Sequence, residues 1–415
     1  MNLKGRDGGW RAVAAFFAAN VLFAAGLFSH AFLYNFYLDT LGRGEGVMGV
    51  AAAALTGGGL VALAPAGAAL DRWGARRIYL AGTGLAASGL AWGALAESTV
   101  WIYAAAALAG AGAASWRVAQ GPILMAVAGP GIRSRAFSWN VGLLLGFGAA
   151  WTAVSGQVPA WLTSATGASP LAGLRLALLL GAAGTLLGGL VFLRVPAPGP
   201  ASTRATDASP SEGARSDRAP LAVSPRVRTL VGWIFVWMAG AALVLPFFNL
   251  YFLRVHGMGV DRIGVLFGVV QAVTALFVLA GGEVAQRLGP RRAFVGWMVV
   301  FPVAVAGLGL GLPLVAAVLL FAVQGLVPPA TNPLLDEIVL DEAEPEAHGA
   351  ASSWRNGATE LSGLVGAAGG GLVLEHASFE VLFGLAATTA LVGGVALALR
   401  FRATPAQEPA PVRSG

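Results

Sequence analysis

Short loops that hold most of the charge divide this sequence into twelve apolar segments of about 20 residues or more. A segment of that length can cross a bilayer as an α-helix. Only helices and closed barrels satisfy their own backbone groups inside a bilayer, so the pattern leaves few folds open. Just 11% of the 415 residues are charged, whereas a soluble protein has about 25%. We predict an all-α membrane protein with twelve transmembrane helices.

The predicted helices form two groups of six. The first group spans 11–38, 46–70, 78–96, 100–128, 136–162 and 171–193, and the second spans 229–253, 261–285, 293–312, 314–340, 349–374 and 379–401. Residues 194–228 are rich in Pro, Ala, Ser and Arg and lack aromatic residues, so they cannot bury enough apolar surface to order themselves. We therefore predict an N-terminal six-helix bundle (1–193), a flexible cytoplasmic linker (194–228), a C-terminal six-helix bundle (229–401) and a cytoplasmic tail (402–415).

The two groups of helices are copies of one another at a constant offset. Residues 67–77 have the sequence GAALDRWGARR, and residues 282–292, which lie 215 positions later, have GEVAQRLGPRR. The same offset aligns residues 32–42 (FLYNFYLDTLG) with residues 247–257 (FFNLYFLRVHG). A single shift that holds over much of each half indicates an internal duplication.

The Lys and Arg residues set the predicted orientation. With the N-terminus inside, 20 of the 26 fall on the cytoplasmic side, and cytoplasmic loops are enriched in these residues. The residues before the first apolar segment are short and polar, and no convincing cleavage site follows, so we expect that segment to remain as the first helix. We predict a multi-pass protein of the inner (cytoplasmic) membrane with both termini in the cytoplasm.

The spacing G-x-x-x-D-R-x-G-x-R-R after the second apolar segment resembles the signature loop of the major facilitator superfamily of secondary transporters. The resemblance implies two pseudo-symmetric six-helix bundles that rock about a central site and expose it to each side of the membrane in turn. It also implies a cavity lined by helices 1, 4, 7 and 10. In this sequence the pattern is carried by Gly67, Asp71, Arg72, Gly74, Arg76 and Arg77.

The resemblance also implies a conformational latch at this loop. In the family, the acidic residue of the loop is thought to bind the cytoplasmic end of helix 11 and so hold the cytoplasmic side shut. Here Asp71 would bind the start of the helix predicted for 349–374, where the helix dipole and Arg355 supply positive charge. The alternative is that Asp71 only caps its helix and the three Arg residues only fix the topology.

Arg117 is predicted to lie inside the membrane, roughly 16 Å from the cytoplasmic end of its helix. Charges at such depth are costly and mark functional sites by default. Residues 117–121, RVAQG, are similar to the R-x-x-Q-G motif in helix 4 of the drug/proton antiporters of the superfamily, which implies a role for Arg117 in proton transfer. The helix 5 signature of those antiporters, G-x-x-x-G-P, is incomplete because Phe147 stands in the place of Pro. A structural Arg is the alternative.

Two acidic residues are candidates for proton coupling. Glu360 is predicted to lie roughly 16 Å from the cytoplasmic face in helix 11, which makes it our first choice. Glu283 is the second, because it stands only a few residues from the cytoplasmic end of helix 8, where its side chain could reach the headgroups. The alternative for Glu360 is a structural acid that is permanently protonated or pairs with an Arg.

An ion pair is predicted at the outer side. Asp39 ends the first predicted helix, and Arg254, its equivalent under the 215 offset, ends the seventh. By the family resemblance these helices face each other across the interface between the halves. We therefore predict an Asp39–Arg254 bridge that helps to close an outer gate, with a modest energy of about 0 to 1 kcal/mol.

The predicted substrate cavity is mostly aromatic and amide in character. Its helix 1 residues recur at intervals of three and four, which places them on one face, and the prolines at 328, 329 and 333 should break helix 10 and free carbonyl groups. Aromatic walls with few charges suit an amphipathic or lipophilic substrate, although such stripes can also be packing. The predicted lining residues are Asn20, His30, Tyr34, Tyr37, Gln120, Trp237, Asn249, Gln324 and Asn332.

These features together predict proton-coupled efflux of a small amphipathic or lipophilic compound by alternating access. A proton-coupled uptake symporter for a metabolite is the runner-up, and a non-transporting membrane receptor on the same fold is a third reading. The chain has no Cys and four scattered His, and it lacks nucleophile–base and phosphate-loop motifs, so we expect no enzyme activity, cofactor or metal. We expect a monomer whose partners are the small-molecule substrate, protons and the lipid bilayer, with no nucleic acid.

Overall fold

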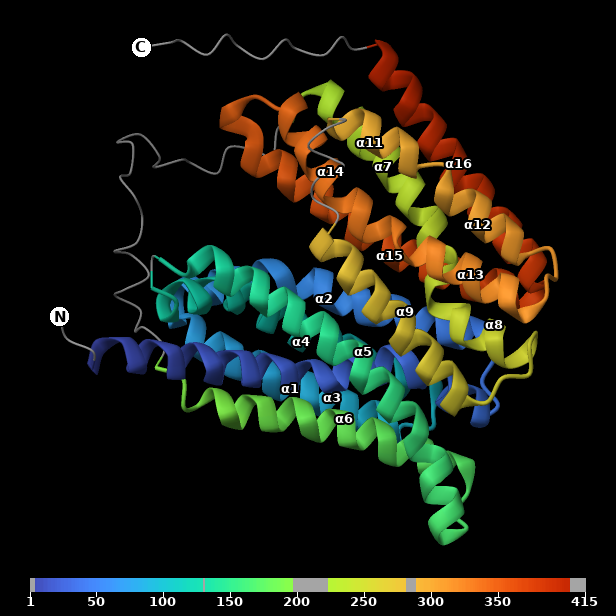
Figure 1. Ribbon diagram of the computed structural model, residues 1–415, viewed down its shortest axis with the longest axis horizontal. Coiled ribbons are helices and arrows are strands. Elements are labelled where there is room, and N and C mark those ends of the chain that lie inside the picture. The colour runs from blue at the N-terminus through green and yellow to red at the C-terminus, as the bar shows by residue number, and fades with distance from the viewer. Residues whose placement is uncertain (1–3, 130, 197–222, 281–288, 404–415) are drawn as a thin grey trace.

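The computed structural model describes residues 4–129, 131–196, 223–280 and 289–403, and every regular element within them is a helix. Figure 1 shows two bundles, one built from the blue-to-green helices and the other from the yellow-to-red helices. The predicted all-α fold class is confirmed. The N-terminal bundle consists of α1 (Lys4–Thr40), α2 (Glu45–Trp73), α3 (Ala75–Leu95), α4 (Thr99–Val127), α5 (Arg133–Thr166) and α6 (Pro170–Phe192).

The C-terminal bundle has more interruptions than its counterpart. Pro246 and the pair Pro328 and Pro329 lie at two of them, and proline removes a backbone donor from a helix. Two short 3₁₀ turns, η1 (Leu245–Phe247) and η2 (Pro345–Ala347), join helical pieces. The helices are α7 (Pro225–Val244), α8 (Phe248–Arg254), α9 (Val260–Ala280), α11 (Pro290–Trp297), α12 (Val300–Leu308), α13 (Leu314–Gly325), α14 (Val327–Glu342), α15 (His348–His376) and α16 (Phe379–Ala403).

Eleven helical segments in the described part of the chain are long and apolar enough to cross a membrane. They correspond to eleven of the twelve predicted spans. The twelfth is α4, which has 29 residues, carries Arg117 and Gln120 and is not among the eleven. Because α4 packs against α2 and α3, it belongs to the N-terminal bundle, and the twelve-helix organisation accounts for the helices of the described residues.

Two predicted boundaries were wrong by several residues. The first helix begins at Lys4 instead of residue 11. The seventh begins at Pro225 instead of residue 229, because Ser224 caps it: the Ser224 hydroxyl accepts a hydrogen bond from the Val227 amide at 3.3 Å, and proline is favourable in the first helical turn. Most of the predicted linker (197–222) and of the tail (404–415) lies outside the described residues.

The internal duplication is visible in the backbone. Gly42 and Gly257 have φ values of 68° and 60°, and Gly74 and Gly289 have values of 82° and 77°. Each pair is separated by 215 residues, so the same left-handed turns recur at equivalent positions of the two halves. Only glycine adopts this conformation without strain, which explains why glycine occupies all four positions.

The two bundles meet along two helix pairs, α2 with α15 and α5 with α9. Each pair crosses at glycines: a Cβ on Gly49 would lie 2.8 Å from the Gly371 Cα, and a Cβ on Gly156 would lie 3.1 Å from the Gly264 Cα. The 215 offset relates Gly49 to Gly264 and Gly156 to Gly371. The two crossings are therefore duplicates of one another. At both, the small residues allow the helix backbones to pack closely, as is common in membrane proteins.

The ends of the molecule differ in how closely the bundles approach. We call the end where α6 finishes and α7 begins the linker end, and the opposite end, where α1 is followed by α2, the far end. Figure 1 shows the bundles close together around α8 and α9 at the far end and further apart at the linker end, where α1 begins. The structure is thus a state in which the bundles are joined at the far end and separated at the linker end.

Candidate functional site

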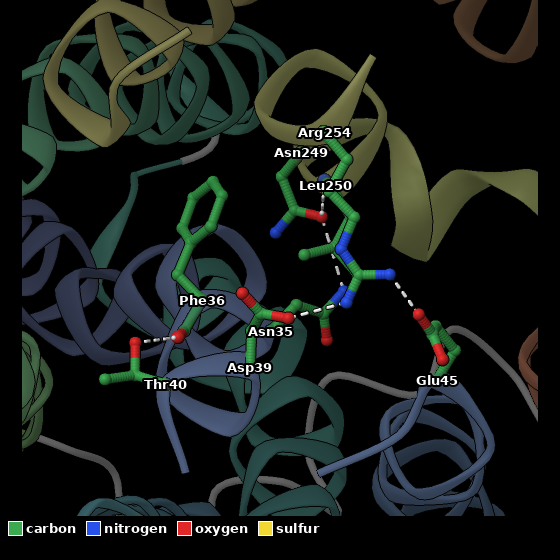
Figure 2. A network of polar contacts seen from close by, with 8 residues as sticks. All are labelled: Asn35, Phe36, Asp39, Thr40, Glu45, Asn249, Leu250 and Arg254. Atoms are coloured by element: carbon green, nitrogen blue, oxygen red, sulfur yellow. Dashed lines mark hydrogen bonds and ion pairs between the residues drawn. The ribbon is translucent and has the colours of Figure 1, made fainter. Parts of the chain in front are cut away.

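A charged cluster joins the bundles at the far end. The Arg254 guanidinium on α8 lies 2.6 Å from the Asp39 carboxylate on α1 and also pairs with Glu45, in the first turn of α2. Figure 2 shows Arg254 reaching between the two carboxylates. The structure therefore brings together the two residues that were predicted to pair. It adds Glu45, which the sequence analysis missed although an acidic residue in a first helical turn is a recognisable signal.

Two buried asparagines lie next to this cluster and also join the bundles. Asn35 donates hydrogen bonds to the Pro246 carbonyl at 2.5 Å and to the Asn249 side chain at 3.3 Å. Asn249 in turn donates to the Phe32 carbonyl at 2.9 Å. Asn249 was predicted to line the cavity, but it contributes instead to the closure of the far end (Figure 2).

A second ion pair joins the bundles nearer the middle of the molecule. The Arg117 guanidinium on α4 lies 3.0 Å from the Glu360 carboxylate on α15. The Arg117 side chain is 60% exposed and the Glu360 side chain 26%, although Arg117 stands about 15 Å from the end of its helix. The pair is therefore accessible although it lies deep along the helix. Glu283, the second acidic candidate, lies outside the described residues.

Amide side chains form a closed network inside the N-terminal bundle, beside Arg117. Asn20 on α1 donates to Asn140 at 2.8 Å and to Gln120 at 3.2 Å, and it accepts a hydrogen bond from the Tyr79 hydroxyl at 2.9 Å. Asn140 also donates to Gln120 at 3.3 Å. The network links α1, α3, α4 and α5. Asn20 is fully buried, so its hydrogen bonds serve the bundle in this state, and Asn140 and Tyr79 are members that the sequence analysis missed.

Arg355 is held within the C-terminal bundle. Its guanidinium lies 2.9 Å from the Asp336 carboxylate on α14 and donates to Asn332 at 3.2 Å and to Thr359 at 2.9 Å. Asp71 is exposed and has no ion pair among the described residues. The predicted Asp71–Arg355 contact is therefore absent from this state, because the bundles are apart at the linker end.

The remaining residues of the signature loop have local contacts. Arg76 donates to the Val195 and Leu193 carbonyls at 3.0 and 2.9 Å and so ties the start of α3 to the end of α6. Gly74 provides the left-handed turn between α2 and α3. Gly67 is half-buried, and Arg72 and Arg77 are exposed.

Several predicted cavity residues face the interior of their own bundle in this state. The Tyr34 and Tyr37 hydroxyls donate to the Gly93 and Ala96 carbonyls at the end of α3, at 3.4 and 2.9 Å. Trp237 is 4% exposed and packs on Phe294, with ring centroids 5.3 Å apart. Helical spacing identified a common face, but that face is the packed one.

Other predicted cavity residues also contact groups within their own bundle. His30 stacks on Tyr34 with ring centroids 4.1 Å apart. Gln324 is 2% exposed and donates to the Phe321 carbonyl of its own helix at 3.1 Å. Of the nine predicted lining residues, three are only partly buried: His30, Gln120 and Asn332.

Comparison with known proteins identifies the family. A family model described as the Major Facilitator Superfamily matches residues 15–260 and 234–415. The chain belongs to the major facilitator superfamily. This makes it a multi-pass membrane transporter and not an enzyme. No curated protein matches the sequence significantly.

Solved structures of transporters share the fold. A mutant form of the nucleoside transporter NupG is 17% identical, with a TM-score of 0.78 and coverage of 94% of this chain and 100% of that one. An inward-facing, unoccupied bacterial homolog of the human lysosomal transporter Spinster is 15% identical, with a TM-score of 0.69 and coverage of 94% of each chain. A peptide transporter POT in complex with alafosfalin is 15% identical, with a TM-score of 0.69 and coverage of 95% and 94%. At these identities the likeness extends to the fold alone.

Reversing one charge at the far end of this transporter should slow transport. Asp39→Arg or Arg254→Asp alone places like charges together, and the double swap should restore activity in part, because Glu45 then meets a carboxylate at position 254. Exposed ion pairs contribute about 0 to 1 kcal/mol each, so we expect changes of about fivefold at most. Initial transport rates of the three variants measure this.

The Glu97–Arg175 pair provides the matched control. Its atoms lie 2.5 Å apart at the same end of the molecule, but both residues belong to the N-terminal bundle. Reversing those charges should leave the rate unchanged. A far-end double swap that is no faster than either single reversal would contradict a bridging role for Asp39 and Arg254.

Replacing Asn20 by Leu should destabilise the N-terminal bundle. The change removes partners from Tyr79, Gln120 and Asn140 together, and each buried polar group left without a hydrogen bond costs about 1–3 kcal/mol. The melting temperature of the purified protein should fall clearly. Thr389→Ala is the control, because the exposed Thr389 hydroxyl bonds only to the Leu385 carbonyl of its own helix; equal melting temperatures for the two variants would refute the structural role of the network.

Proposed function

We propose that this chain exports a small amphipathic or lipophilic molecule in exchange for protons, and that the Arg117–Glu360 pair couples the two movements. The observation that carries the proposal is the position of this pair. It is an ion pair that joins the two bundles at a depth of about 15 Å, and it lies at the inner limit of the space that separates them. Charged residues within membrane-spanning helices are functional candidates by default, and this pair stands where the moving parts meet.

The orientation proposed for the chain makes the linker end cytoplasmic. The linker, the signature loop and both termini carry most of the Lys and Arg residues, and such loops stay in the cytoplasm. The state described here would then receive molecules from the cytoplasmic side while Arg254, Asp39 and Glu45 keep the outer side closed. An exporter loads its substrate in such a state.

The proposed cycle follows from what each ion pair joins. In the present state Glu360 is ionised and holds Arg117, having released its proton to the cytoplasm. Rocking of the bundles about the two glycine crossings would break the far-end cluster, open the outer side and bring Asp71 towards the start of α15. A proton from outside would then neutralise Glu360, free Arg117 and prepare the return of the bundles.

Uptake is the second candidate, because the same pair could couple symport of a metabolite. Everted membrane vesicles separate the two mechanisms. When a proton gradient directed into the vesicles is imposed, a proton-coupled exporter and a proton symporter should move the substrate in opposite directions. A non-transporting receptor on this fold would bind its ligand and show no flux in either arrangement.

Substrate accumulation in cells that lack their own pumps tests the proposal. Cells that express the intact chain or Arg117→Ala would be exposed to lipophilic cations and neutral lipophilic compounds. We expect the intact chain to lower accumulation of some of them, a protonophore to abolish the effect, and Arg117→Ala to lack it. An abundant, correctly inserted protein that moves nothing on the panel would overturn export and direct the search to uptake of metabolites.

A further inference from the structure

An apolar groove of about 460 Å³ lies at the seam between the two bundles. Its lining includes Leu60 of α2, Phe235 of α7, and Trp354 and Leu361 of α15. These residues stand on the linker side of the crossing between Gly49 and Gly371. A volume of this size is in the range of small-molecule sites, about 300–1,000 Å³.

The groove lies on an exposed apolar face of α15. Trp354 and Leu361 are 40% and 44% exposed, and Val365 and Leu372, further along α15, are 48% and 52% exposed. Their spacing of seven, four and seven residues places all four on one face of the helix. An exposed apolar stripe on a membrane-spanning helix contacts lipid. A molecule dissolved in the bilayer therefore reaches the groove without crossing water.

The groove adjoins the Arg117–Glu360 pair. A smaller cavity of about 70 Å³ is lined by Gly59, Arg117 and Glu360. Gly59 directly precedes Leu60, and Glu360 directly precedes Leu361, so residues that are neighbours on α2 and on α15 line the two spaces. Arg117 and Glu360 are the charged residues of the smaller cavity.

Two glycines leave room in the groove. Gly232 and Gly357 line it, and a Cβ placed on either would meet no atom within 4 Å. These glycines are therefore not needed for close packing of helices, in contrast to those at the crossings. Their effect is to keep the space empty.

We propose that the groove binds the hydrocarbon portion of the transported amphiphile, received directly from the bilayer, while the polar head of the same molecule lies at Arg117 and Glu360. The inference rests on the proposed export function for the identity of the ligand as substrate. It adds a site and a chemical class: a molecule with a flexible alkyl chain and a charged head, in place of a compact lipophilic compound.

Quenching of Trp354 fluorescence tests binding without any transport. Bromododecanoate and bromododecyltrimethylammonium, whose brominated chains quench tryptophan on contact, are added to the full chain in bilayer nanodiscs. The same titration is made with Trp354→Phe, and the difference isolates Trp354 from the other tryptophans. We expect saturable quenching of Trp354 by at least one of the two amphiphiles. Absence of any saturable difference would overturn the proposal.

A groove-filling variant provides the decisive comparison. Gly357→Leu should weaken amphiphile binding, measured by the saturable quenching, about tenfold, because the Leu side chain fills space in an apolar pocket. Gly384→Leu on α16 is the matched control, because a Cβ there also meets nothing within 4 Å and the position is outside the groove. Equal quenching curves for the two variants would count against the site.

Brominated phospholipid in the nanodisc separates the substrate from ordinary lipid. If that lipid quenches Trp354 fully and the amphiphiles add nothing, the groove holds bilayer lipid and the proposal is wrong. Because the readout is binding, the result remains interpretable if Arg117→Ala shows that transport is not proton-driven. Failure of the proposed function and failure of the groove are therefore distinguishable.

Discussion

Glu360→Gln should abolish proton-driven transport and leave substrate exchange intact. Gln has the shape of a protonated carboxyl group but cannot lose a proton, so the ion pair with Arg117 across 3.0 Å cannot form. Coupling free energies between two sites correspond to about 5- to 150-fold effects, and we expect a loss of net driven transport within that range. Vesicles with an imposed proton gradient measure driven transport, and counterflow without a gradient measures exchange.

Glu346→Gln is the control for this variant. Glu346 is exposed and lies in the η2 turn, away from the centre of any membrane-spanning helix. It should leave both activities unchanged. Driven transport that persists in Glu360→Gln would exclude Glu360 as the coupling residue. Loss of exchange together with driven transport, in a protein that is folded and inserted, would show that Glu360 is required for substrate binding or structure and would not identify it as the coupling residue.

Gly49→Ala should shift the transporter away from the state described here. The added Cβ would lie 2.5 Å from the Ala367 carbonyl oxygen and 2.8 Å from the Gly371 Cα, so α2 and α15 must separate at their crossing. Overpacking of this kind costs about 1–3 kcal/mol, which changes the ratio of two states by about 5- to 150-fold. Spin labels on Val100→Cys and Val315→Cys, equivalent positions at the far end of the two halves, should report a longer distance.

The absence of native cysteine makes such labelling specific. Gly84→Ala is the matched control, because a Cβ on Gly84 meets no atom within 4 Å, and it should leave the distance distribution unchanged. The folding of each bundle should be unaffected in both variants, since the Gly49 contact lies between bundles. An unchanged far-end distance in Gly49→Ala would show that the crossing tolerates a side chain and does not control the state.

The sequence predicts the fold well because the membrane imposes strong constraints. Apolar length fixes where helices lie, and the 215 offset fixes which helices are equivalent, so the glycine turns at 42, 74, 257 and 289 recur as the duplication requires. The same logic placed Asp39 opposite Arg254. Helix ends set by caps, such as Ser224 with Pro225, depend on local hydrogen bonds and were misplaced by several residues.

The site was less predictable because depth and periodicity do not show which way a side chain points. Arg117 and Glu360 were chosen separately for their depth, and their contact depends on how far the bundles are rotated relative to each other. Tyr34 and Tyr37 share a helix face with the other predicted cavity residues of α1, yet the hydroxyl of each donates a hydrogen bond to a carbonyl at the end of α3. Glu45 was missed because its partner, Arg254, also pairs with Asp39. The 215 offset relates residues two at a time, so it does not indicate a third member of such a cluster.

Distances at both ends of the intact protein and of Glu360→Gln test the central claim most directly, and they require no knowledge of the substrate. One label pair is Val100→Cys with Val315→Cys at the far end, and the other is Phe137→Cys with Ser352→Cys at the linker end. The account predicts that Glu360→Gln, or low pH in the intact protein, lengthens the linker-end distance and shortens the far-end distance in the same molecules, because protonation of Glu360 prepares the return of the bundles to the present state. If both distances stay at the values of the intact protein under both conditions, protonation of Glu360 does not drive the change of state, and the coupling mechanism is wrong.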